Sequence, residues 1–127
     1  MPSPAPLRTD DLHHLVLLYL SVAYAADNSF DPAEHHTVLK LVRQWMPGLS
    51  PAEADGIVDT ALKALRGGMT EAPETLAQAV GTLLTPGQRR RVLADLGLVA
   101  RADGFLTVQE ARMIRRVRAA LEEADDA

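Results

Sequence analysis

Apolar residues recur along much of the chain at the spacing of one face of an α-helix. One such stripe comprises Ala54, Ile57, Val58, Ala61, Leu62 and Leu65, and another comprises Ile114, Val117 and Leu121. A spacing of about three or four residues places these side chains on one helical face, which packs against a core. No stretch of the chain shows the sustained alternation of apolar and polar residues that is typical of a β-strand. The pattern therefore predicts an all-α fold.

The predicted helix starts share a signature in which a capping residue is followed three positions later by Glu or Gln. It occurs as Asp31-Pro32-Ala33-Glu34, Ser50-Pro51-Ala52-Glu53, Thr85-Pro86-Gly87-Gln88 and Thr107-Val108-Gln109-Glu110. Thr9 and Thr70 are weaker caps, and Gly67-Gly68 is a stop signal. These signals predict about six helices, at 10–26, 32–46, 51–66, 71–84, 87–102 and 108–123. We expect a single domain over residues 1–127, with frayed ends at about 1–8 and 123–127.

Two parts of the chain repeat one apolar pattern at an offset of 76 residues. Val16, Leu17, Leu20, Val22 and Ala23 align with Val92, Leu93, Leu96, Leu98 and Val99, while Val38, Leu41 and Trp45 align with Ile114, Val117 and Leu121. The repeat predicts two similar helical hairpins that pack with pseudo-twofold symmetry, with the middle helix pair covering one side. The repeated faces should bury Tyr19, Leu41, Trp45 and Val117.

Composition limits the chemistry that the chain can perform. Its 127 residues are 47% hydrophobic and include no Cys, which excludes disulfides and a cysteine nucleophile and leaves oxygen and imidazole as metal ligands. The longest apolar run, from Leu15 to Ala26, has 12 residues, whereas a membrane span needs ~20. The N-terminal residues lack the basic region and cleavage site of an export signal. We therefore expect a cytoplasmic protein that does not insert into a membrane.

Two similar stretches, AADNSFDPAEHH at 25–36 and RADGFLTVQEAR at 101–112, place a Glu seven positions after an Asp. Helix caps and Asx-turns account for these residues without any ligand. Asp27 and Asp103, however, are predicted at helix C-termini, where the helix dipole disfavours a carboxylate and a bound cation would reverse that effect. The first turn is not an EF-hand, because Pro32 and Val38 stand where that loop requires Gly and a bidentate Glu.

The two Ala-Asp turns, about 75 residues apart with Leu49-Ser50-Pro51-Ala52-Glu53 between them, resemble the tellurite-resistance TerB-like family. The resemblance extends from about Leu18 to Leu121. It implies an all-helical bacterial cytoplasmic domain, linked to tellurite and other stress responses. It also implies an acidic site for a divalent metal ion of unknown identity at Asp27 and Glu34 in the first turn and at Asp103 and Glu110 in the second. Asp31 is a further candidate ligand in the first turn. Because Thr107 stands where an acid often occurs in the family, the first turn should dominate this site.

The histidines and arginines provide secondary candidates. His35 adjoins Glu34 and could reach the first turn, whereas His14 precedes Asp27 by 13 residues, or ~20 Å along a helix. The segment 86–118 carries eight of the 13 Lys and Arg residues, in the clusters Arg89-Arg90-Arg91 and Arg112, Arg115 and Arg116. This basic surface lacks interleaved aromatics and the chain has a net charge of -4, which favours a solvated face or an acidic protein partner over nucleic acid.

Two functions from different classes fit these observations. The first is a TerB-like module that binds a divalent cation and acts as a stress-linked accessory protein. The second is a metal-free helical module that docks an unidentified protein partner through its basic or apolar faces. The sequence contains no glycine-rich phosphate loop, Ser-His-Asp constellation or H-E-x-x-H motif, so we expect a protein that is not an enzyme. The sequence leaves the oligomeric state open.

Overall fold

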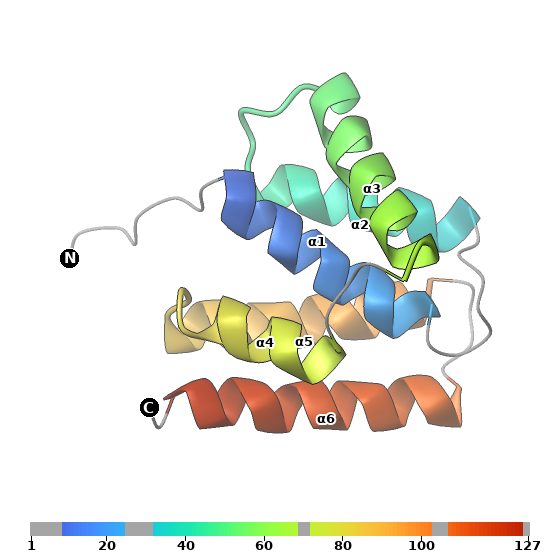
Figure 1. Cartoon of the computed structure of the whole chain (residues 1–127). Coiled ribbons are helices and arrows are strands. Elements are labelled where there is room, and N and C mark those ends of the chain that lie inside the picture. The colour runs from blue at the N-terminus through green and yellow to red at the C-terminus, as the bar shows by residue number, and fades with distance from the viewer. Residues whose placement is uncertain (1–8, 25–31, 69–71, 103–106, 126–127) are drawn as a thin grey trace.

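The computed structural model describes residues 9–24, 32–68, 72–102 and 107–125, and this part of the chain is helical without any strand (Figure 1). Its helices are α1 (Thr9–Tyr24), α2 (Pro32–Trp45), α3 (Pro51–Arg66), α4 (Pro73–Gly81), α5 (Pro86–Ala100) and α6 (Val108–Asp125). The prediction of an all-α fold with about six helices is therefore confirmed.

Helix α1 forms the centre of the core. Every residue from Leu15 to Ala23 is buried, and α1 packs against each of the other helices. The surrounding helices bury one face each, as the stripe of Ala54, Val58 and Ala61 does on α3. The described part of the apolar run, from Leu15 to Tyr24, thus belongs to a buried core helix. No helix within the described residues is long and apolar enough to cross a membrane.

The predicted hairpins are formed by α1 with α2 and by α5 with α6. In Figure 1, α1 and α5 end, and α2 and α6 begin, at the same end of the molecule, on the right. Helix α3 packs on α1 and α2, whereas α4 packs on α1 and α6. The pseudo-twofold relation between the hairpins, with the middle helices on one side, stays a prediction.

Three of the predicted capping boxes form, at Ser50, Thr85 and Thr107. In each of them the cap hydroxyl accepts the backbone N–H of the third helical residue, and the side chain of that residue accepts the backbone N–H of the cap. The box predicted at Asp31 lies outside the described residues. Gly67 ends α3, and Gly68 adopts a positive φ of 69°, so the predicted stop signal is also confirmed.

The predicted limits of α4 were wrong at both ends. Its N-cap is Ala72, which has an extended ψ of 148° and makes no side-chain capping bond, so Thr70 is not the cap. The cause is Pro73, because proline disfavours a helical conformation in the residue before it. The helix ends at Gly81, three residues early, since glycine is a poor helix former. In contrast, α6 continues to Asp125, beyond the predicted end at residue 123.

Candidate functional site: buried glutamates and a buried polar cluster

Two of the predicted metal ligands, Glu34 and Glu110, are the third residues of α2 and α6. Their side chains are largely withdrawn from solvent, with relative exposures of 5% for Glu34 and 4% for Glu110. They are equivalent positions of the sequence repeat, and the helices that carry them begin at the same end of the molecule (Figure 1). Acidic side chains are rarely buried to this extent, so both glutamates are candidates for a functional role.

The local geometry at Glu110 is that of a helix N-terminus. Its backbone N–H donates to Thr107 Oγ1 at 3.0 Å, and its Oε1 accepts the backbone N–H of Thr107 at 3.3 Å. The exposed amides and the helix dipole at this end favour negative charge. At least one oxygen of Glu110 therefore has a structural task in the capping box.

The other predicted ligands, Asp27, Asp31 and Asp103, lie outside the described residues. Within the described ranges, His, Asp and Glu side chains nowhere gather in a group of three that could hold a metal ion. The structure thus places two of the five predicted carboxylates and leaves the complete ligand set as a prediction.

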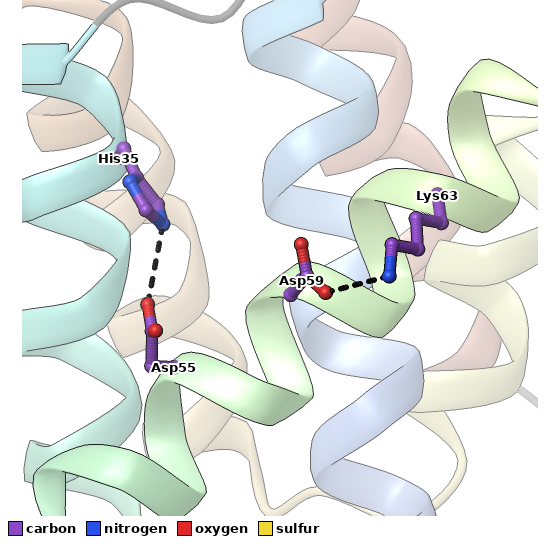
Figure 2. A network of polar contacts seen from close by, with 4 residues as sticks. All are labelled: His35, Asp55, Asp59 and Lys63. Carbon is purple, nitrogen blue, oxygen red and sulfur yellow. Dashed lines mark ion pairs between the residues drawn. The ribbon is translucent and has the colours of Figure 1, made fainter.

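His35, the secondary candidate, faces α3. Its Nε2 lies 3.8 Å from Asp55 Oδ1, and the two side chains are 40% and 63% exposed. Figure 2 shows the pair bridging α2 and α3, with Asp59 and Lys63 forming a second pair farther along α3, at 3.1 Å. Asp55 and Asp59 are exposed on the surface of α3, and the sequence pattern did not indicate the contact of Asp55 with His35.

A buried polar cluster that sequence reasoning missed joins α1, α2 and α5. The Tyr19 hydroxyl donates to Asp95 Oδ2 at 2.6 Å, and the Trp45 indole N–H donates to the same oxygen at 2.9 Å. The Arg91 guanidinium lies over the Trp45 ring, 4.0 Å from its centroid. Tyr19 and Asp95 are almost fully buried, whereas Trp45 is only partly buried. The expectation for Trp45 is thus met in part, because its side chain packs against the core but keeps some exposure.

The environment of Tyr19 keeps its hydroxyl protonated. Burial raises the pKa of Tyr19 well above its usual value, and the negative charge and hydrogen bond of Asp95 raise this pKa further. Trp45 and Arg91 act in the opposite direction but do not outweigh these effects. A phenol held in this state is a hydrogen-bond donor, not a nucleophile. We therefore assign the cluster a structural role.

Two signals in the sequence could have revealed this cluster. Asp95 lies on the same helical stripe as the buried Val92, Leu96 and Val99, so the apolar period places a carboxylate inside the core. Asp95 also occupies the repeat position equivalent to Tyr19, 76 residues away. A contact between equivalent positions is what a pseudo-twofold axis passing between them would produce.

The basic surface predicted on α5 and α6 is partly engaged in contacts within the chain. Arg89 donates to the carbonyl oxygen of Gly81 at 2.7 Å, and Arg91 is stacked on Trp45. Arg116 lies 4.0 Å from Glu74, and Arg118 lies 3.7 Å from Glu122. Much of this positive charge therefore stabilises the fold or is neutralised locally.

The fold and its buried glutamates define a small all-α module in which two helical hairpins each carry a buried carboxylate at the start of their second helix. The family model described as Tellurite resistance protein TerB matches residues 12–126, which is nearly the whole chain, so the chain belongs to the TerB family. This match confirms the resemblance that the two Ala-Asp turns indicated. No curated protein and no solved structure matches the chain.

Proposed function

We propose that the chain is a non-catalytic bacterial module that holds a divalent cation where α1 leads into α2. We further propose that it serves in the cytoplasm as an accessory protein of a stress response of the tellurite-resistance type. Membership of the TerB family supports the proposed role in a stress response, because the family model carries the description Tellurite resistance protein TerB. The first part depends on the carboxylates of the acidic turns.

The observation that carries the cation proposal is the burial of Glu34 at the start of α2. Removing a carboxylate from water costs free energy that hydrogen bonds or a positive charge must offset. Asp27 and Asp31 stand seven and three residues before Glu34, and hard divalent cations prefer such carboxylate oxygens. A cation bound by these residues would reduce the repulsion among the carboxylates and would add a positive charge beside the buried Glu34.

The second turn should contribute less. Thr107 is the repeat equivalent of Asp31 and supplies a hydroxyl in place of a carboxylate. This hydroxyl already accepts the backbone N–H of Glu110. If the protein holds one cation, we expect the first turn to provide most of its ligands.

Thermal unfolding in the presence of calcium, magnesium, manganese or zinc tests the cation proposal. A cation that binds only the folded chain stabilises it by RT ln(1 + [L]/Kd), or about 2.7 kcal/mol at a hundredfold excess over Kd. We expect at least one of these cations to raise the melting temperature. Mass spectrometry of the native protein should then show the same cation bound.

Two substitutions distinguish binding from capping. Glu34→Gln should abolish the stabilisation by metal, because an amide keeps the shape but lacks the charge. Glu53→Gln is the matched control, since Glu53 is also the third residue of a capped helix but is exposed. It should leave the metal response unchanged. A melting temperature that none of the four cations shifts, or an equal loss of response in both variants, would refute the cation site.

A further inference from the structure

The exposed face of α2 carries a row of basic side chains that is separate from the basic surface predicted on α5 and α6. His36, Lys40 and Arg43 are spaced by four and three residues, which places them on one face of the helix. All of them are exposed. Arg101 follows the end of α5 and is also exposed.

Two grooves run along this row, one on each side of α2. The groove towards α3 has a volume of about 350 Å³ and is lined by Leu39, Pro51 and Ala54 together with the three basic residues. The groove towards α5 also has a volume of about 350 Å³, and its lining includes Leu41, Leu98 and Arg101. His36 and Lys40 line both grooves, so they form the ridge that separates them.

The charges of this surface are not balanced from within the described part of the chain. Neither groove has an Asp or Glu among its lining residues. The ion pairs of the described residues engage Lys63, Arg116, Arg118 and His35, but not Lys40, Arg43 or Arg101. In a chain with a net charge of -4, this local excess of positive charge indicates a surface suited to a negatively charged partner.

We propose that these two grooves, which we call the α2 grooves, bind an acidic segment of a partner protein that also carries bulky aliphatic side chains. The basic ridge would attract and orient the acidic residues, while aliphatic side chains would fill the grooves on either side. Leu98, which is 56% exposed at the α5 groove, offers an apolar contact there. This proposal is independent of the cation proposal, because none of its residues is a candidate metal ligand.

Other occupants fit the α2 grooves less well. Their walls contain no aromatic side chain except the imidazole of His36, whereas proteins that bind single-stranded nucleic acid stack the bases on aromatic rings. The acidic C-terminal stretch of a second copy, EEADDA at residues 122–127, has only alanines as apolar residues. Alanine is too small to fill either groove.

Fluorescence anisotropy with a labelled acidic peptide tests the proposal. The probe is a peptide of roughly four helical turns, rich in Glu with Leu at every third or fourth position, in buffer that contains a chelator. We expect saturable binding that weakens with added salt. A companion peptide with Gln in place of Glu, and another with Ala in place of Leu, should each bind about tenfold more weakly or worse.

Charge-reversal variants locate the binding surface. Lys40→Glu combined with Arg43→Glu should weaken binding of the acidic peptide by about tenfold or more. Arg112→Glu combined with Arg115→Glu is the matched control, because it makes the same change in net charge on exposed positions of α6. Its affinity should stay within about twofold of that of the wild type. Circular dichroism verifies that both variants remain folded, and Leu98→Ala, at an exposed position, tests the apolar contribution separately.

The proposal is supported if Lys40→Glu with Arg43→Glu weakens binding of the acidic peptide, the α6 control does not, and Leu98→Ala also binds it more weakly. Equal loss in both charge-reversal variants would show an effect of net charge alone and overturn it. Equally tight binding of a single-stranded oligonucleotide would also overturn it, as would self-association that Lys40→Glu with Arg43→Glu abolishes.

Discussion

Asp95 introduces a carboxylate into the apolar core at the point where α1, α2 and α5 meet. It is only 4% exposed, and one of its oxygens accepts hydrogen bonds from both Tyr19 and Trp45. The donors are neutral, so the cluster satisfies the polar groups without a full ion pair in the core. A buried network of this kind stabilises the fold only while every member keeps its partner.

We predict that Asp95→Ala strongly destabilises the protein. Loss of the carboxylate removes the acceptor of the fully buried Tyr19 hydroxyl. It also removes the closer of two acceptors of the Trp45 indole N–H, which donates to the Tyr19 hydroxyl oxygen as well, at 3.1 Å. Each buried polar group left without a partner costs about 1–3 kcal/mol. Urea denaturation should show a lower free energy of unfolding for Asp95→Ala, and a smaller loss for Asp95→Asn, which retains an acceptor oxygen. Equal stability of Asp95→Ala and the wild type would contradict a structural role.

At the scale of the helices, the local sequence predicted the capped starts at Ser50, Thr85 and Thr107 but neither limit of α4. Ser50 and Thr85 form their boxes because both hydrogen bonds join residues three positions apart. The early end of α4 at Gly81 has a local cause in the poor helix propensity of glycine. It is also stabilised by another helix, because Arg89 of α5 donates to the Gly81 carbonyl oxygen. Such a contact is not visible in the local pattern.

We predict different effects of alanine at two glycines that follow helices. No other atoms lie close to a Cβ added at either Gly68 or Gly48, so neither substitution causes a clash. Gly68, however, has a positive φ of 69°, which costs a residue with a Cβ about 1–2 kcal/mol. Gly68→Ala should therefore lower the free energy of unfolding by this amount, while Gly48→Ala should have little effect. Similar urea midpoints for the two variants would show that backbone strain at Gly68 is unimportant.

At the scale of the whole molecule, the sequence predicted the all-α class but not the side-chain contacts between helices. Apolar stripes reveal which face of a helix is buried, and they do not state which face of another helix covers it. The α2 grooves show this limit, because they combine residues of α2 with residues of α3 or α5. The buried glutamates show the opposite case, because the repeated turns alone indicate Glu34 and Glu110 as candidate ligands.

The buried polar cluster of Tyr19, Trp45 and Asp95 connects α1, α2 and α5. The protonation state of the Tyr19 hydroxyl should therefore affect the stability of the whole molecule. Because the folded state raises the pKa of Tyr19, its contribution to stability is fully present below the unfolded value of about 10. This contribution is lost as the pH rises from there towards the folded pKa, by up to about 1.4 kcal/mol per pH unit. We predict that the free energy of unfolding of the wild type decreases above about pH 10.

Tyr19→Phe isolates this effect, because it removes the ionisable group and keeps the ring. Above about pH 10, its free energy of unfolding should decrease less steeply than that of the wild type. Its stability at neutral pH should be lower, since Asp95 loses one donor. Tyr24→Phe, which leaves the bond between Tyr19 and Asp95 intact, should retain the steeper decrease. Urea denaturation at several alkaline pH values measures these slopes, and parallel curves for the wild type and Tyr19→Phe would show that Tyr19 does not determine alkaline stability.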